Sequence, residues 1–146
     1  MKTPLENLLS LKRWEEDEAK NLYALARKEL DDEEKRLAGL EGNFKVLRVK
    51  MQYPEKGAVA IDEIKKMNVH LEHLLGLLQR QKDMVAASEK RLNEAMNILT
   101  EAAKQRKTYE KVDERHKDAE TQELKKKERK GMDEHASMRY KKQYGE

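Results

Sequence analysis

Residues 52–61 read QYPEKGAVAI and divide the sequence into two long stretches of helical character. Pro54 and Gly57 stand three residues apart in this segment, and such a pair is typical of a turn. The segment lies about a third of the way along the 146 residues. It therefore predicts a hairpin whose two arms differ in length.

Composition favours long helices over a compact globule. Charged residues make up 42% of the chain and aromatic residues 5%, which is typical of coiled coils. Disorder is the alternative at this charge content, but the apolar residues recur at regular intervals. The net charge of +3 gives little support for nucleic acid or a membrane as partner. The absence of cysteine excludes disulfides and thiolate metal sites and suits a cytosolic protein.

The start of the first helix carries a capping signal. Thr3 and Glu6 fit the N-cap and N3 positions of a capping box, with Pro4 at the first helical position. From there, eleven of fourteen positions at strict 3/4 spacing are apolar, which is the pattern of a coiled-coil seam. These seam positions are Leu5, Leu9, Lys12, Glu16, Ala19, Tyr23, Ala26, Leu30, Glu33, Leu37, Leu40, Phe44, Leu47 and Met51. They predict a helix over residues ~4–51.

A second seam follows the turn, with ten apolar residues in thirteen positions. Its members are Ile61, Ile64, Asn68, Leu71, Leu75, Leu78, Lys82, Val85, Glu89, Leu92, Met96, Leu99 and Ala103. The pattern stops at the next two positions, Arg106 and Glu110. It predicts a turn at ~52–60 and a helix at ~60–140.

Two seams joined by a short turn should pair antiparallel. If facing residues have numbers that sum to about 112, as a turn centred near residue 56 implies, Leu5 at the start of the first helix faces residue ~107. The prediction is thus an all-α fold: a single-domain, long antiparallel two-helix coiled-coil hairpin over residues 1–146, whose second helix overhangs at ~108–146. Gly131 is the expected site of a kink or local break in that overhang.

Apolar residues outside the two seams form shorter stripes. One contains Met67, His70, Leu74, Leu77, Gln81 and Met84, and another contains Leu8, Leu11, Leu22 and Leu25. They either broaden the core or provide docking faces. Near the turn we expect an exposed docking face made of Val46, Met67, His70, Leu74 and Leu77.

Nothing in the sequence predicts catalysis. His70 and His73 stand at i, i+3 without the further ligands that a metal site needs. There is no phosphate-binding glycine loop and no set of nucleophile, base and orienting group. We expect no enzyme activity, cofactor, metal or small-molecule substrate. The Lys125–Lys130 run could contact phosphates or an acidic protein surface, or form a solvated helix face.

Both ends of the chain resemble one family. LENLLSLKRWEEDEAKNLYALARKEL (residues 5–30) and ELKKKERKGMDEHASMRYKKQ (residues 123–143) are similar to the ends of FliJ-type flagellar export proteins and of their YscO-type virulence-secretion relatives. The residues that match best are Glu128, Met132, Asp133, Glu134, Ala136 and Arg139. The resemblance covers nearly the whole chain.

The resemblance implies a soluble, cytoplasmic component of the type III flagellar export apparatus that reaches the membrane only through its partners. Such proteins look like a stalk that inserts into the ring of a FliI-like export ATPase, promotes its assembly, contacts a FlhA-like export gate protein and cycles export chaperones. The expected ring contacts are Leu8, Leu11, Lys125, Lys126, Lys127, Arg129, Lys130, Asp133, Glu134 and Arg139. The alternatives are a nucleic-acid-binding arm, which would use the Lys125–Lys130 run, and a generic scaffold coiled coil.

Overall fold

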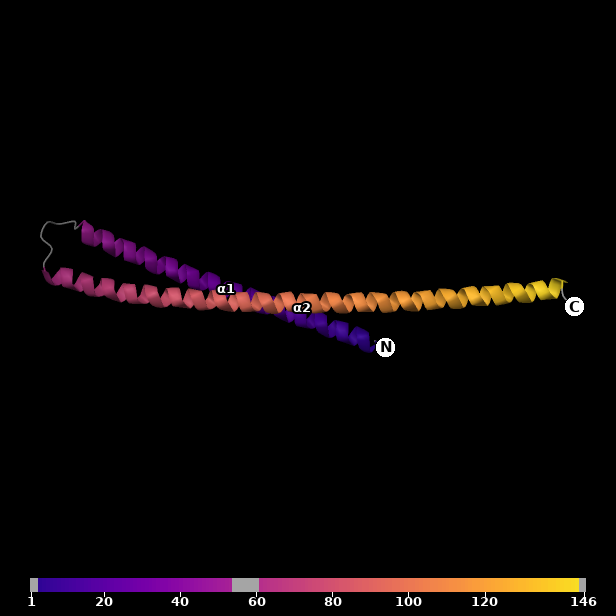
Figure 1. Ribbon diagram of the computed structural model, residues 1–146. Coiled ribbons are helices and arrows are strands. Elements are labelled where there is room, and N and C mark those ends of the chain that lie inside the picture. Colours follow the sequence, from indigo (N-terminus) through magenta and orange to yellow (C-terminus); the bar gives the residue numbers. More distant parts are fainter. Residues whose placement is uncertain (1–2, 54–60, 145–146) are drawn as a thin grey trace. The chain divides into compact units, whose positions relative to one another are not determined.

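The computed structural model describes residues 3–53 and 61–144. Within these ranges the chain forms two helices and no strand: α1, Pro4–Gln52, and α2, Ile61–Tyr144 (Figure 1). The two helices pack against each other, which confirms the predicted all-α hairpin. The predicted turn falls mostly on residues 54–60, outside the described residues.

Helix α1 begins with the predicted capping box. The Thr3 N–H donates to Oε2 of Glu6 at 3.2 Å, and the Glu6 N–H donates to Oγ1 of Thr3 at 3.1 Å. The Thr3 carbonyl oxygen accepts from the Asn7 N–H at 3.0 Å, which closes the first helical turn. These bonds satisfy donors that a helix N-terminus otherwise leaves without a partner.

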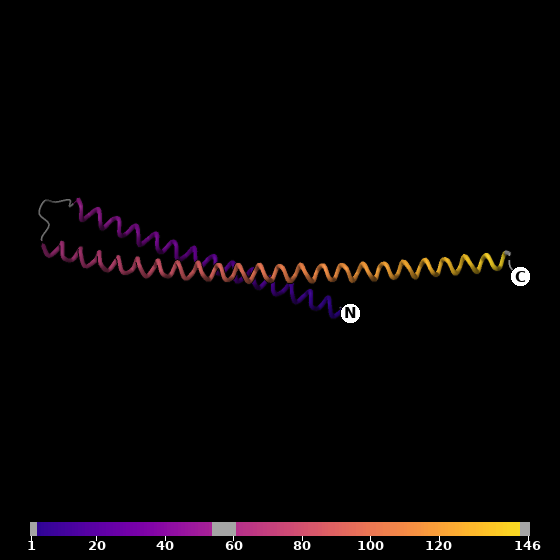
Figure 2. Tube along the Cα trace, viewed as in Figure 1, coloured from indigo at the N-terminus to yellow at the C-terminus, as the bar shows by residue number. Residues whose placement is uncertain are grey.

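Helix α2 continues to Tyr144 and is unbroken at Gly131 (Figure 2). The prediction of a local break at this glycine is therefore wrong. One glycine costs a helix only about 1 kcal/mol relative to alanine. The neighbouring lysine, arginine and glutamate residues are good helix formers and offset that cost.

The chain divides into two compact units, and each contains part of both helices. We call Asp17–Glu101 the turn unit. Met1–Glu16 together with Ala102–Glu146 form the tail unit. Within each unit, side chains lie between α1 and α2, and the chemistry of these side chains differs from one unit to the other.

In the turn unit the helices run antiparallel. Glu33 of α1 is hydrogen-bonded to Gln81 of α2, whereas the earlier Glu29 pairs with the later Arg91. Every α1 residue that the first seam assigned to this unit is buried or partly buried. The buried hydrophobic residues of the unit are Ala19, Ala26, Leu74, Leu78 and Ala95. The seam predicted for α1 is thus confirmed here.

The seam predicted for α2 is half wrong. In the turn unit, buried or partly buried side chains recur at 3/4 spacing at Met67, Leu71, Leu74, Leu78, Gln81, Val85, Ser88, Leu92, Ala95 and Leu99. Five of the predicted members belong to this set, but seven are exposed: Ile61, Ile64, Asn68, Leu75, Lys82, Glu89 and Met96. From residue 68 on, each exposed member directly follows a true seam residue. The true seam includes polar Gln81 and Ser88, and the predicted register includes polar Asn68, Lys82 and Glu89, so a count of apolar residues does not separate the two registers.

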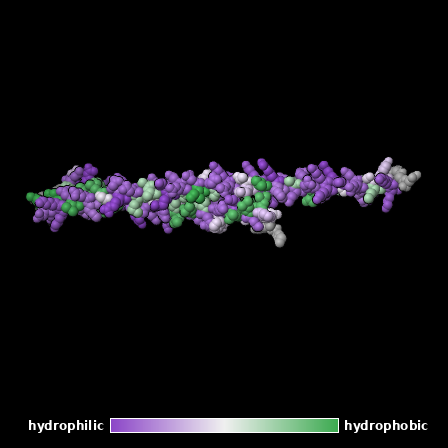
Figure 3. Space-filling model, turned by 60° about the horizontal axis from the view of Figure 1, so that its bottom comes forward, coloured by the Kyte–Doolittle hydropathy of each residue, from purple (hydrophilic) through white to green (hydrophobic). Residues whose placement is uncertain are grey.

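In the tail unit the contact between the helices continues further along α2 than predicted. The Arg13 and Glu110 side chains lie 3.6 Å apart, and Asp113 is buried. From Glu114 to Gln143 every side chain is exposed. The overhang therefore begins after Asp113 instead of at residue ~108. Its surface is mainly hydrophilic (Figure 3).

Neither described helix contains a segment that is long and apolar enough to cross a membrane.

Candidate partner-binding surfaces

The docking face predicted near the turn is only partly exposed. Val46 and His70 are exposed, and Met67 and Leu77 are partly buried. Leu74 is 5% exposed and belongs to the α2 seam. Its inclusion in an exposed face is therefore wrong, because α2 is rotated by one residue relative to the predicted register.

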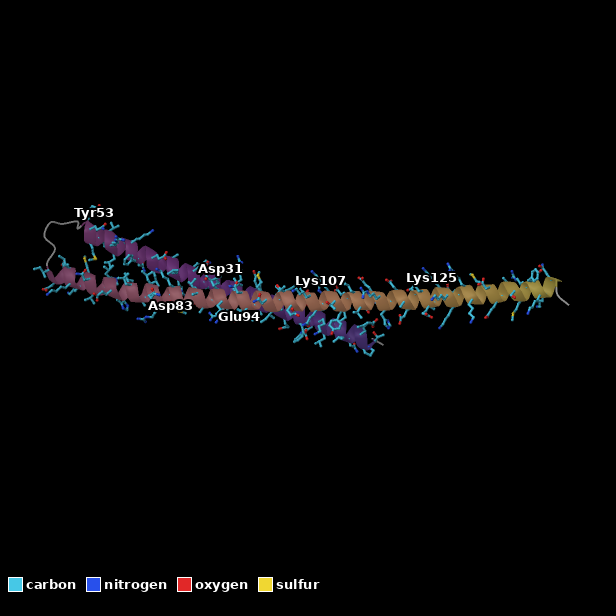
Figure 4. The ribbon with its side chains drawn as sticks, in the orientation of Figure 1. Asp31, Tyr53, Asp83, Glu94, Lys107 and Lys125 are labelled. Atoms are coloured by element: carbon cyan, nitrogen blue, oxygen red, sulfur yellow. The ribbon has the colours of Figure 1, made fainter. Side chains whose placement is uncertain are left out.

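The residues expected to contact an ATPase ring lie in the tail unit. The members from the overhang are all exposed: Lys125, Lys126, Lys127, Arg129, Lys130, Asp133, Glu134 and Arg139. Lys125 projects from the α2 ribbon in Figure 4. In α1, Leu11 is exposed and Leu8 is partly buried. The overhang thus presents a continuous charged helix to solvent.

The histidine pair His70 and His73 has no third ligand nearby. Among residues 3–53 and 61–144, no group of three or more His, Asp or Glu side chains is placed to hold a metal ion.

A charged cluster between α1 and α2 in the tail unit was missed as a structural feature. The Arg106 Nε donates to Oε2 of Glu16 at 2.8 Å, and the Arg106 Nη1 donates to Oε2 of Glu110 at 3.0 Å. The other oxygen of Glu110 lies 3.6 Å from Arg13. Glu16 is 7% exposed. Two carboxylates and two guanidinium groups therefore connect the helices in the unit that also contains the buried apolar side chain of Leu9.

Lys12 forms the second half of this cluster. Its Nζ donates to Oε1 of Gln105 at 2.8 Å and to Oε2 of Glu15 at 3.3 Å. The same ammonium group stands 5.6 Å from the centre of the Tyr109 ring, within cation–π range. All these partners belong to the tail unit, so the cluster fixes the register of α1 on α2 there.

The electrostatics of the cluster favour full ionisation of Arg106. The hydrogen bond that Arg106 donates to Glu16 is the largest cause that raises the pKa of Arg106 above its ordinary value, and Glu110 adds to it. A group whose pKa is raised on folding stabilises the folded state fully at pH values below its ordinary pKa. This stabilisation is lost only as the pH rises through the raised pKa. That window lies in strong alkali, so the ion pair keeps its charge at neutral pH.

A sequence signal for this cluster was present. Lys12 and Glu16 occupy positions of the α1 seam, and Arg106 follows directly in the α2 seam. Charges of opposite sign at facing seam positions indicate that the two helices continue to pair, through polar contacts. A count limited to apolar residues instead ended the seam near Ala103.

A polar contact also holds the register in the turn unit. Nε2 of Gln81 donates to the carbonyl oxygen of Glu33 at 2.9 Å and to its carboxylate. The Glu33 carboxylate accepts a second bond from Arg36 at 2.8 Å. Because buried polar groups need partners, the register that joins Gln81 to Glu33 satisfies the buried amide of Gln81.

Comparison with known proteins gives one match. A family model described as "Flagellar FliJ protein" matches residues 1–145. Neither the curated proteins nor the solved structures contain a match to this chain.

Proposed function

Because the chain belongs to the flagellar FliJ protein family, a family of export-associated coiled-coil proteins, we propose that it is the stalk of a flagellar export ATPase. In this function the overhang enters the ring of the ATPase, promotes assembly of the ring and couples it to the export gate. The observation that carries the proposal is the overhang itself: α2 continues as one helix with every side chain exposed from Glu114 to Gln143.

The dimensions of the overhang suit a shaft. At 1.5 Å per residue, the exposed stretch of helix is roughly 45 Å long. Isolated helices without a partner are marginally stable, so a surrounding ring would also stabilise the overhang.

The chemistry of the overhang suits weak, reversible contacts. Lys125–Lys127, Arg129, Lys130 and Arg139 would meet acidic groups of the ring, while Asp133 and Glu134 would set the register. Exposed ion pairs are worth less than about 1 kcal/mol each and are screened by salt. A shaft must turn or shift inside its ring, and individually weak contacts permit that movement.

Docking to the export gate protein and to export chaperones is assigned to the turn unit. The surface proposed for it consists of Val46 and His70, with the accessible parts of Met67 and Leu77. Leu74 is omitted because it packs in the seam. In this proposal the chain acts by binding, without enzyme activity.

The experiment that tests the stalk proposal is deletion of residues 121–146. The described side chains in this range are exposed up to Gln143, so the truncated protein should keep the helical pairing of both units. We expect it to lose stimulation of hexamer formation and activity of a flagellar export ATPase. Full stimulation by the truncated protein would contradict the stalk proposal.

Two charge-reversal variants give a matched comparison. Replacing Lys125, Lys126 and Lys127 by Glu should weaken stimulation, whereas replacing exposed Lys65 and Lys66 by Glu should not. Binding of bulk RNA is measured with the same proteins. If the overhang variant loses RNA binding and keeps ATPase stimulation, the chain is a nucleic-acid-binding arm instead.

A further inference from the structure

An open apolar groove lies along one side of the helix pair in the turn unit. Its volume is ≈ 300 Å³. The groove is lined by Leu22, Leu25, Ala26 and Glu29 of α1 and by Arg91, Glu94, Ala95 and Ile98 of α2. Neither the docking face near the turn nor the overhang includes any of these residues.

The groove has a small-residue floor and large apolar walls. Ala26 and Ala95 are buried, whereas Leu22, Leu25 and Ile98 are 44%, 56% and 50% exposed. Small side chains on the floor let another element approach closely, and the half-exposed walls have apolar surface left to bury. A contiguous apolar patch of this kind on a soluble protein indicates an interaction site.

The rim of the groove is acidic. Glu29 pairs with Arg91 at 3.7 Å, and Glu33 pairs with Arg36 at 2.8 Å, so both arginines are neutralised locally. Asp32, which lines the adjoining polar groove, and Glu94 have no ion-pair partner among the described residues. The remaining negative charge disfavours the same groove of another copy as occupant and favours a basic helix.

The chain itself contains a helix with these properties. Residues 121–143 carry eight Lys and Arg residues against four Asp and Glu residues. Leu124, Met132 and Met138 are 60%, 73% and 68% exposed. At about 100° per residue, these three side chains fall on one side of the helix. Lys127, Glu128 and Arg139 lie on the same side, so this side of the net basic segment carries both charged and unburied apolar side chains.

We infer that the groove of the turn unit binds residues 121–143 of a second copy of this chain. The occupant comes from another copy because Ile98 and Leu124 belong to one unbroken helix, which cannot fold back on itself. The contact joins two different surfaces, so it is heterologous and can propagate from copy to copy. This self-association goes beyond the stalk proposal and does not depend on it.

The physical character of the contact predicts its strength and its salt dependence. The apolar part of the groove is short, so affinity is low and association depends on protein concentration. The charges on both sides are exposed, so salt weakens the contact. The overhang cannot occupy a ring and a groove at the same time, so the two forms of the protein compete.

Cross-linking of the full-length chain tests the inference. Equal amounts of unlabelled and ¹⁵N-labelled protein are mixed and treated with a zero-length carbodiimide, which joins lysine amines to carboxylates. We expect links of mixed isotope composition between the lysines of residues 121–143 and Asp32 or Glu94. Links of single isotope composition alone, or no link between these regions, would overturn the inference.

Sedimentation equilibrium of matched variants gives an independent readout. Ile98→Glu places a charge in the groove wall, and Met96→Glu is its control, because Met96 is 48% exposed but does not line the groove. We expect about tenfold weaker self-association for Ile98→Glu and no change for Met96→Glu. Glu94→Lys, with Glu89→Lys as its control, repeats the test at an exposed rim position. A monomer at all concentrations, or equal effects of variant and control, contradicts the inference.

Discussion

The turn unit and the tail unit place different chemistry at the same 3/4 spacing. In the turn unit, Ala19, Ala26 and Leu78 are buried between the helices. In the tail unit, the corresponding place is taken by Glu16 and Arg106, which form an ion pair at 2.8 Å. The spacing alone decides that two helices pair, whereas the residue types decide how strongly. Apolar burial stabilises at about 25 cal/mol per Å², but an ion pair must first overcome its own desolvation.

The largest expected effect is loss of a leucine from the seam of the turn unit. Leu74→Ala removes a side chain that is 5% exposed, and its neighbour Leu75, at 48% exposed, provides the control. We expect Leu74→Ala to lower the free energy of unfolding by about 2–5 kcal/mol. Leu75→Ala should change it by less than about 1 kcal/mol. Leucine and alanine have similar helix propensity, and the half-exposed Leu75 loses little buried apolar surface.

Urea unfolding followed by circular dichroism measures both leucine variants. Leu75 belongs to the register predicted from apolar counting, and Leu74 belongs to the register of the structure. A larger loss for Leu75→Ala than for Leu74→Ala would restore the predicted register and contradict the seam described above.

The two helices show why one seam was predictable and the other was not. In α1 the competing apolar residues Leu22 and Leu25 are followed by Leu30, Leu37 and Leu40, which lie on the true seam and have no large apolar residue directly beside them. In α2, Leu75 and Met96 are exposed beside the true seam members Leu74 and Ala95. Because apolar residues stand both on the true seam and directly beside it, a count of apolar residues makes the two registers of α2 similarly plausible. The choice depends on partner atoms, such as those that Glu33 offers to Gln81, which no single helix contains.

The charged cluster was lost from the prediction for a related reason. Hydrophobic periodicity infers burial from residue type. It therefore leaves Arg106 out of the seam because arginine is charged, although Arg106 lies between the helices. The overhang could be predicted because it needs only the absence of a partner. Its first residue could not, because that depends on how far the ion pairs extend the contact.

The second prediction tests the tail unit through Arg106. Arg106→Leu removes the hydrogen bond that Arg106 donates to the largely buried Glu16 carboxylate, so we expect the helix pair of the tail unit to lose stability, by less than Leu74→Ala costs the turn unit. The loss is local, so hydrogen exchange of residues 3–16 and 102–113 measures it better than global unfolding.

The matched control for Arg106→Leu is the double replacement of Arg106 and Glu16 by Leu. Replacement of both charges removes the carboxylate that Arg106→Leu deprives of its bond and adds apolar surface, so hydrogen-exchange protection should return to the original level or exceed it. If the double variant is as poorly protected as Arg106→Leu, the ion pair is not what holds these helices together.

The third prediction concerns the N-terminal cap of α1. Thr3→Ala removes the oxygen that accepts from the Glu6 N–H, so we expect the first turn of α1 to lose about 1 kcal/mol. Thr3→Ser keeps this oxygen and should retain most of the protection. Amide exchange of residues 5–7 distinguishes the two variants. Equal exchange rates in both would show that the capping box does not stabilise this end.

The smallest effect is expected at the rim of the charged cluster. The Arg13 and Glu110 side chains are 3.6 Å apart and are 58% and 32% exposed, whereas Arg106 and Glu16 are 24% and 9% exposed. Water and salt therefore screen the outer pair, and Glu110 keeps its hydrogen bond from Arg106 when Arg13 is lost. We expect Arg13→Gln to cost less than about 0.5 kcal/mol, and 1 M salt to abolish that cost. Hydrogen exchange of residues 102–113 at low and high salt measures it. A cost for Arg13→Gln as large as that for Arg106→Leu would mean that exposure to solvent does not determine how much each ion pair stabilises the tail unit. The contrast between the two units would then rest on the apolar seam alone.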